Sequence, residues 1–189
     1  MFLEPGFAEN KSGWIEVICG CMFSGKTEEL LRRINRARIA RQSFKVFKPV
    51  IENRYHHENV VTHNENFIEA IPVSSPSEII ALSENVSVIA IDEAQFFDNS
   101  IVDVCNSLAN NGSRVIVAGL DMNSQGKPFG PMPYLLAVAE FVTKLHAICA
   151  VSGELASFSF RKSLSDEEFL LGATDIYEAR SRKYFYING

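Results

Sequence analysis

A glycine-framed segment near the N-terminus carries the clearest chemical signal in the chain. Its residues read Gly20-Cys21-Met22-Phe23-Ser24-Gly25-Lys26-Thr27, which matches the phosphate-binding pattern G-x-x-x-x-G-K-[ST]. In such a loop, backbone N–H groups turn towards phosphate, and the N-terminus of the following helix adds partial positive charge. Lys26 is expected to reach the β- and γ-phosphates, and the Thr27 hydroxyl to ligate Mg²⁺. All eight residues are predicted to bind a nucleoside triphosphate.

Two acidic residues follow a second apolar run. Residues 86–91 are rich in β-branched side chains, as in a buried parallel strand, and end at Asp92 and Glu93. Open α/β sheets place their ligands at the carboxyl ends of strands. Asp92 is expected to hold Mg²⁺, and Glu93 could take a proton from an attacking oxygen. Alone, paired acids after a strand are more often a solvated loop, but the upstream phosphate loop favours the catalytic interpretation.

The elements that would position these residues alternate between strands and helices. Strand patterns lie at 14–19, 44–48, 86–91, 114–119 and 141–148, with a short strand pair at 59–71. Helical patterns lie after the phosphate loop, at 76–82 behind Ser75, from a cap at Asp98 or Asn99 to Asn110, and beyond Tyr134 to Glu140. This rhythm predicts a mainly parallel sheet covered by helices on both faces.

The last 40 or so residues lose this rhythm. They hold short β-like pieces at 158–160 and 184–187, and the change in character begins near Cys149. We therefore predict an α/β nucleotide-binding domain at 13–148 and a small β-rich domain at 149–189.

Composition narrows the class of protein. The 189 residues include 18 Lys and Arg against 23 Asp and Glu, a formal net charge of −5, which argues against a general nucleic-acid surface. Five arginines around the first helix form a solvated face more readily than a nucleic-acid stripe: Arg32, Arg33, Arg36, Arg38 and Arg41. The sequence starts without a secretory signal pattern and has no membrane-length apolar run. Four cysteines at no disulfide or zinc spacing indicate reduced thiols, and a cytoplasmic location is expected.

With these residues assembled, the chain resembles the type II thymidine kinases, the family of the human cytosolic and poxviral enzymes. The resemblance runs from Trp14 to Ile187 and rests on the phosphate loop, Phe-Lys-Pro, Ile-Asp-Glu-Ala-Gln-Phe-Phe, Gly-Leu-Asp, Lys-Pro-Phe-Gly and the segment at 139–145. It implies a P-loop NTPase (RecA-like) sheet with a small C-terminal lasso domain. It also implies transfer of the γ-phosphoryl of ATP to the 5′-hydroxyl of thymidine with Mg²⁺, and a homotetramer. From the acidic balance and the apolar runs of the sequence, we expect neither nucleic acid nor membrane as a partner.

The resemblance assigns roles residue by residue. Lys26, Thr27 and Asp92 hold the triphosphate and its metal, Glu93 is the general base, and Arg54 lies near the phosphates, where a cation offsets transition-state charge. The nucleoside site is expected to comprise Met22, Glu52, Arg54, Phe96, Leu120, Phe129, Ser159, Leu170 and Tyr177. The lasso would span about Ser159 to Tyr177 and grip the base.

The chain also departs from this family. Most relatives hold the lasso with four zinc-binding cysteines, but the matching positions here are Cys149, Ser152, Ser181 and Tyr184. Ser and Tyr are poor zinc ligands, so we predict no structural zinc and a more mobile lasso. Glu52 replaces an aspartate, Ser124 a phenylalanine of the base pocket, and Ala173 the second lasso glycine.

Three other functions stay open at this stage. A broader pyrimidine deoxynucleoside kinase is suggested by Ser124, and a decayed relative that binds nucleotides without catalysis by the lost zinc ligands. A nucleic-acid-dependent ATPase would share Asp-Glu-Ala-Gln, but the acidic balance and short length disfavour it. Retention of Lys26 and Glu93 favours an active kinase.

Overall fold

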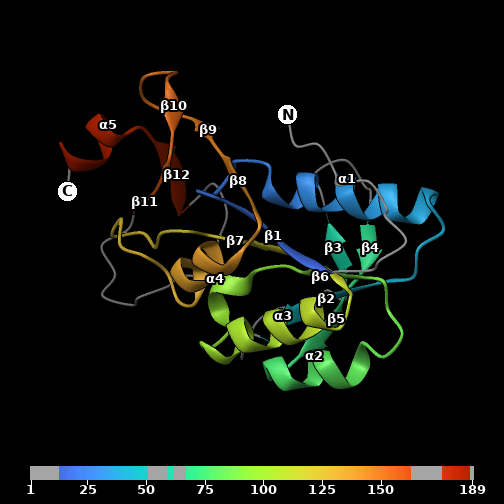
Figure 1. Cartoon of the computed structure of the whole chain (residues 1–189). Coiled ribbons are helices and arrows are strands. Elements are labelled where there is room, and N and C mark those ends of the chain that lie inside the picture. Colours follow the sequence, from blue (N-terminus) through green and yellow to red (C-terminus); the bar gives the residue numbers. More distant parts are fainter. Residues whose placement is uncertain (1–12, 51–58, 62–66, 163–175, 188–189) are drawn as a thin grey trace.

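The computed structural model describes residues 13–50, 59–61, 67–162 and 176–187 (Figure 1). Within these residues, six strands form a sheet in the order β5-β2-β6-β7-β1-β8, and each neighbouring pair is parallel. The strands are β1 (Trp14–Gly20), β2 (Phe44–Pro49), β5 (Ile71–Val73), β6 (Val88–Ile91), β7 (Arg114–Gly119) and β8 (Phe141–Leu145). The predicted parallel α/β sheet is confirmed.

Helices cover both faces of this sheet, as Figure 1 shows. Helix α1 (Lys26–Ile39) packs Leu30, Ile34 and Ala37 against one face. Helices α2 (Pro76–Leu82), α3 (Ser100–Asn110) and α4 (Met132–Val138) pack against the other, where Ile101 and Leu135 join a larger core. Because β6 and β7 are covered on both sides, every residue in them is buried, which explains why they are apolar apart from Arg114.

Local signals fix where the helices begin. The Glu78 carboxylate accepts hydrogen bonds from the Ser74 and Ser75 N–H groups at 3.1 and 3.0 Å, which closes the N-terminus of α2. At α3, the Asp98 carboxylate accepts the Ser100 N–H at 2.8 Å, so Asp98 supplies the side-chain hydrogen bond although Asn99 occupies the cap position.

A buried ion network fastens α1 to the sheet. Glu16 of β1 is fully buried and binds Arg33 of α1 at 2.7 Å and Arg114 of β7 at 2.6 Å. Arg33 also reaches Glu29 at 2.8 Å and donates to the Thr143 hydroxyl at 2.9 Å. The prediction that the arginines of this helix form a solvated face is therefore wrong for Arg33, whose position faces the sheet rather than solvent.

The C-terminal module, defined here as residues 147–161 and 177–186, consists of two antiparallel strand pairs and a short helix. Strand β9 (Ala147–Ile148) pairs with β10 (Leu155–Ala156), and β11 (Phe158–Arg161) pairs with β12 (Tyr177–Arg180). A small core of its own joins Cys21 of the phosphate loop to four residues of the module: Ala147, Cys149, Ala156 and Ala179. A division into domains at 148 and 149 stays a prediction.

Three sequence expectations need adjustment. Residues 184–187 are not β-like: helix α5 (Arg182–Tyr186) forms there, and Phe185 stacks on Phe158 with ring centroids 4.6 Å apart. An apolar run of four residues is too short to set a period, so packing decides its form. The expected strand at 141–148 divides into β8 and β9, which belong to different sheets. Helix α4 begins at Met132, earlier than expected. The short strand pair expected at 59–71 forms as antiparallel β3 (Asn59–Val61) and β4 (Phe67–Glu69).

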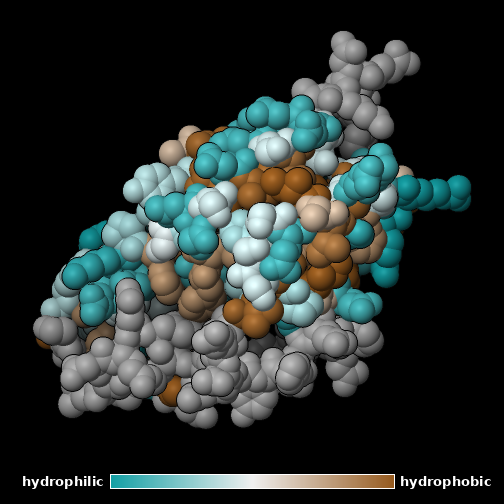
Figure 2. Space-filling model, turned by 90° about the horizontal axis from the view of Figure 1, so that it is seen from below, coloured by the Kyte–Doolittle hydropathy of each residue, from teal (hydrophilic) through white to brown (hydrophobic). Residues whose placement is uncertain are grey.

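The surface is mixed in character. Figure 2 views the face that lies lowest in Figure 1 and shows hydrophobic residues gathered among hydrophilic ones. Helix α2 exposes Ile80 and Leu82, at 42% and 40%. Among the described residues, no helix combines the length and the apolar character needed to cross a membrane.

Candidate functional site

The phosphate-loop and acidic residues meet at one edge of the sheet. Strands β6, β7 and β1 are neighbours and parallel, so their carboxyl ends lie side by side. The chain leaves β1 at Gly20, β6 just before Asp92, and β7 just before Leu120. Three connections that are far apart in the sequence therefore converge where open α/β sheets bind ligands.

The phosphate loop depends on backbone conformations that side chains rarely adopt. Gly20 and Gly25 have φ values of 146° and 83°, and a Cβ at Gly20 would lie 2.3 Å from the Leu145 carbonyl oxygen. The Ser24 hydroxyl is buried and has no hydrogen-bond partner among the described residues. A tight loop with an unsatisfied buried hydroxyl at the start of a helix is suited to accept a polyphosphate.

Two of the charged groups expected at this edge are Lys26 and Asp92. Lys26 begins α1, and its ammonium donates a hydrogen bond to the Cys21 carbonyl at 2.8 Å. Asp92 is buried, and its carboxylate accepts the Glu93 N–H at 2.9 Å. Burial, followed by repulsion from Glu93, raises the pKa of Asp92 to about 7. A cation bound there would reverse this shift, and a carboxylate offers the hard oxygen donors that Mg²⁺ prefers.

Glu93 occupies a strained backbone position at the start of a short 3₁₀ turn, η1 (Ala94–Phe96). Its φ of 53° is left-handed, which is uncommon for a residue other than glycine, and its side chain is exposed. The neighbouring Gln95 is 2% exposed. Its amide donates to the Glu93 carboxylate at 2.5 Å and accepts the Leu120 N–H at 2.9 Å. Sequence reasoning did not identify Gln95 as a site residue, because a glutamine in a short turn gives no signal of its own.

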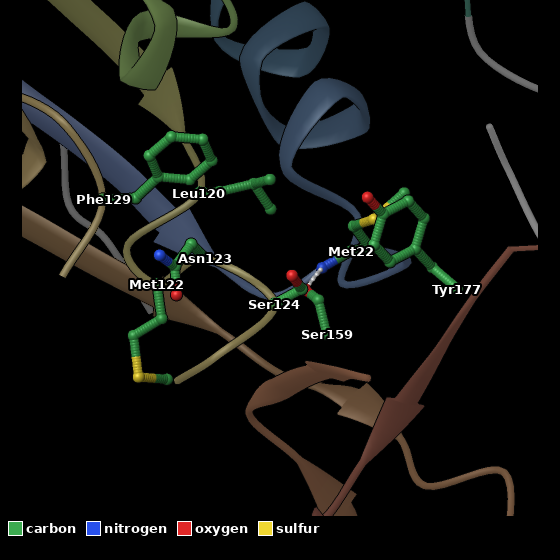
Figure 3. A pocket seen from close by; sticks show the side chains of 8 residues that line it. All are labelled: Met22, Leu120, Met122, Asn123, Ser124, Phe129, Ser159 and Tyr177. Atoms are coloured by element: carbon green, nitrogen blue, oxygen red, sulfur yellow. Dashed lines mark hydrogen bonds between the residues drawn. The ribbon is translucent and has the colours of Figure 1, made fainter. Parts of the chain in front are cut away.

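A pocket opens beside this edge (Figure 3). It is lined by residues of the phosphate loop, the segment after β7, and the strands β11 and β12: Met22, Leu120, Met122, Asn123, Ser124, Phe129, Ser159 and Tyr177. Phe96 meets Phe129 edge to face, with ring centroids 5.5 Å apart. Among the residues expected to contact a nucleoside, the structure brings together Met22, Leu120, Phe129, Ser159 and Tyr177, with Phe96 behind them.

Two contacts tie the C-terminal module to the phosphate loop. The Met22 N–H donates to the Ser159 hydroxyl at 2.9 Å, as Figure 3 shows, and the Cys21 thiol donates to the Ala156 carbonyl at 3.4 Å. A polar contact also crosses the pocket rim, where Arg161 donates to the Ser124 hydroxyl at 2.9 Å. The module therefore forms one side of the pocket while resting on the loop.

The decisive comparison concerns the chain as a whole. Residues 13–185 match the family described as thymidine kinase. The chain belongs to the thymidine kinase family. It is 58% identical to a thymidine kinase of Rhodothermus sp. (strain ITI 518), over 92% of this chain and 81% of that protein. It is 52% identical to a thymidine kinase of Bacteroides fragilis, over 98% and 94%. Family membership makes the chain an ATP-using kinase.

Another relative and one solved structure complete the comparison. A thymidine kinase of Porphyromonas gingivalis is 52% identical over 95% of this chain and 89% of that protein. The X-ray structure of the Legionella pneumophila ATPase DotB superposes with a TM-score of 0.41 and 17% identity, over 67% of this chain and 34% of that chain. The assignment to the thymidine kinases rests on the sequence relatives.

Of the four positions that the family resemblance matches to zinc ligands, Cys149 holds the one thiol. Burial raises the pKa of the buried Cys149, but hydrogen bonds from the Ser152 hydroxyl and from N–H groups of Ser181, Ser152 and Val151 outweigh it and lower that pKa to about 6. In the part of the chain that the structure describes, no three of His, Cys, Asp or Glu gather as metal ligands. The absence of zinc stays a prediction.

The structure does not describe every expected site residue. Glu52, Arg54, Leu170 and Ala173, together with most of the lasso, lie outside the described residues. A further acidic residue does lie at the edge: Asp121 binds Lys144 at 2.6 Å through one oxygen, and its other oxygen is buried without a partner among the described residues. Its place directly after β7 could have been inferred from the Gly-Leu-Asp segment.

Proposed function

We propose that this thymidine kinase transfers the γ-phosphoryl group of ATP to the 5′-hydroxyl of thymidine and so produces thymidine monophosphate for DNA synthesis. One observation carries the proposal: the candidate base Glu93 is hydrogen-bonded to Gln95, which in turn holds Leu120 in the wall of the pocket. A proton acceptor is thereby attached to the wall of a pocket with aromatic and apolar lining residues, and both lie beside a phosphate loop.

The phosphate side of the reaction uses charge and position. The loop N–H groups and Lys26 bind the triphosphate of ATP. Thr27 and Asp92 hold Mg²⁺, which neutralises phosphate charge when bound. The buried Ser24 hydroxyl and the raised pKa of Asp92 support this assignment, since both groups gain partners when phosphate and cation bind. Arg54 is proposed to add positive charge near the phosphates.

The nucleoside side uses shape and a few hydrogen bonds. Phe96, Phe129 and Tyr177 provide aromatic surface for the base, and Leu120 and Met22 complete the apolar wall. The Ser159 hydroxyl accepts the Met22 N–H, and a hydroxyl that accepts can still donate its own proton to a base carbonyl. Glu52 and Leu170 are proposed to complete the site. Glu93 removes the proton of the 5′-hydroxyl as the oxygen attacks.

Three further properties are proposed. A homotetrameric assembly is proposed from the family resemblance, together with a cytoplasmic location. The absence of structural zinc is proposed against the resemblance, because Cys149 is the one cysteine at the four matching ligand positions. Metal analysis of purified protein tests the last property, and about one zinc ion per chain would contradict it. Sedimentation analysis tests the tetramer.

The reaction is tested with Mg-ATP and labelled thymidine, comparing the wild type with Glu93→Gln. Wild-type product with at least about a 100-fold lower kcat in the variant is expected, because general-base catalysis contributes about 10²–10⁴-fold. Binding of a fluorescent ATP analogue checks that the variant keeps its phosphate site. ATP binding by the wild type without product would refute the proposed reaction.

A broader pyrimidine deoxynucleoside kinase is the second candidate. The hydrogen bond from Arg161 to Ser124 favours it, because a polar pair stands where relatives place an aromatic wall. Comparing kcat/KM for thymidine, deoxyuridine and deoxycytidine separates the two candidates. Values for deoxycytidine within tenfold of those for thymidine would favour the broader one.

A further inference from the structure

Gln95 is a buried amide whose two ends are both engaged. The Leu120 N–H can only donate, so the amide end it contacts at 2.9 Å must be the carbonyl oxygen. The NH₂ end therefore faces Glu93, and its hydrogen bond to the carboxylate measures 2.5 Å. The backbone of one segment thus fixes the orientation of an amide that grips the side chain of another.

The conformation of Glu93 makes this grip possible. Residues two apart do not face each other on a regular helix. The left-handed φ of Glu93, 53°, turns its side chain back towards Gln95 before the η1 turn begins. An exposed glutamate side chain has several rotatable bonds, so a fixed hydrogen-bond donor restricts the positions that its carboxylate can adopt.

Two glycines reserve the space that Gln95 occupies. A Cβ at Gly130 would lie 2.3 Å from the Gln95 backbone oxygen, and a Cβ at Gly119 would lie 2.9 Å from its side-chain oxygen. Gly130 also has a φ of 48°. The turn that carries Gln95 is therefore held closely between the end of β7 and the loop that carries Phe129.

From these contacts we propose that Gln95 is a positioning residue that aims the Glu93 carboxylate at the nucleoside and couples it to the pocket wall. Leu120 lines the pocket, and Phe96 contacts Phe129. Gln95 is therefore bound to the part of the pocket wall that is proposed to contact the base. The inference rests on the proposed role of Glu93 as general base. A carboxylate displaced by about 1 Å can lose about 100-fold in rate.

The first variant to test is Gln95→Met, which keeps the length of the side chain but removes both hydrogen-bonding groups. We expect kcat to fall by about 10- to 100-fold, while KM for thymidine and for ATP stays within about twofold. Gln42→Met makes the same chemical change beyond the far end of α1 and is expected to leave kcat unchanged. A wild-type kcat in Gln95→Met would overturn the inference.

Gln95→Glu separates the two ends of the amide. When ionised, its carboxylate still accepts the Leu120 N–H, but it cannot donate to Glu93 and places a like charge beside it. We expect a loss of kcat at least as large as in Gln95→Met. If Gln95 served only to hold the wall, this variant would keep its kcat, which would overturn the inference. Because its shape matches glutamine, it also decides the question if Gln95→Met does not fold.

A double variant shows whether Gln95 acts through Glu93. In the Glu93→Gln background, Gln95→Met is expected to lower kcat by less than about twofold, since residues that act as a unit are not additive. An independent, fully additive loss would overturn the inference. If Glu93→Gln alone keeps wild-type activity, the proposed base fails and the inference with it. If Glu93→Gln is inactive but the Gln95 variants keep the wild-type kcat, the inference about Gln95 fails while the proposed function stands.

Discussion

The edge of the main sheet and the C-terminal module contribute to the same pocket but are held in different ways. The main sheet is held by parallel strands buried on both faces and by the ion network that joins Glu16 of β1 to Arg33 of α1 and Arg114 of β7. The module has a small core of mostly alanines and cysteines and rests on the loop through Ser159 and Cys21. The proposed catalytic groups thus come from the part with the larger core, whereas one side of the proposed nucleoside pocket comes from the part with the smaller one.

The largest effect is expected from breaking the buried ion network that fastens α1 to the sheet. Glu16→Gln keeps the shape of the side chain but removes the carboxylate shared by Arg33 and Arg114. Removing one partner of a buried ion pair costs about 3–5 kcal/mol, so the free energy of unfolding should fall by that amount. Urea unfolding measures it. Glu29→Gln in α1 removes the outer ion pair of Arg33 and leaves its pair with Glu16, so it should cost less than Glu16→Gln. Equal losses of unfolding free energy in Glu16→Gln and Glu29→Gln would contradict the expected difference between the buried and the outer ion pair.

A change in the module should affect thymidine more than ATP. Phe185 stacks on Phe158, and a Cβ at Gly126 of the pocket loop would lie 3.0 Å from the Phe185 ring. Truncating a buried phenylalanine to alanine costs about 3–5 kcal/mol of local packing. Phe185→Ala is therefore expected to raise KM for thymidine about tenfold with little change in ATP binding. Steady-state kinetics with each substrate varied tests this. An equally large loss of ATP affinity would show that packing in the C-terminal module also controls ATP binding.

Substituting Ser124 should narrow the choice of nucleoside. Ser124→Phe removes the hydrogen bond from Arg161 and restores aromatic surface to the pocket. The ratio of kcat/KM for thymidine over deoxycytidine should rise by about tenfold, the scale on which one apolar contact discriminates. Ser124→Ala removes the hydrogen bond alone, so it shows which change matters. An unchanged ratio in both variants would remove Ser124 from the specificity argument.

The smallest effect concerns the reactivity of two thiols, one in a helix that covers the main sheet and one in the C-terminal module. Burial raises the pKa of Cys105 in α3 to about 12, whereas hydrogen bonds lower that of Cys149 to about 6. At pH 7 iodoacetamide should therefore alkylate Cys149 before Cys105, and the Cys149 rate should level off above about pH 7. Mass spectrometry after short exposure measures both rates. Faster reaction at Cys105 would contradict the ionised state of Cys149.

The same shift has a defined sign for stability. The folded pKa of Cys149 lies below the value of about 8.5 for an unfolded cysteine, so its contribution is complete above pH 8.5. That contribution is lost as the pH falls from 8.5 through 6. Cys149→Ser should flatten this part of the unfolding profile.

The sequence predicted most of the sheet because its evidence is local. The phosphate loop, the apolar runs of β6 and β7, and the start of α2 at Pro76 are each readable within a few residues. Contacts between segments that are far apart in the sequence could not be predicted from local patterns. The role of Gln95 depends on the left-handed φ of Glu93 and on the adjacency of β6 and β7, and the burial of Arg33 depends on a partner 17 positions away. Helix α5 was missed because packing on Phe158 determines its conformation.

Met22 belongs both to the phosphate loop and to the pocket. It lines the pocket, and its backbone N–H lies in the phosphate loop and donates to Ser159. Any movement of that loop on phosphate binding would therefore move a wall of the pocket, and any displacement of that wall would move the loop. We therefore expect the affinities for the two substrates to be thermodynamically linked. Linkage is reciprocal, so whatever factor ATP imposes on thymidine binding, thymidine imposes on the binding of ATP.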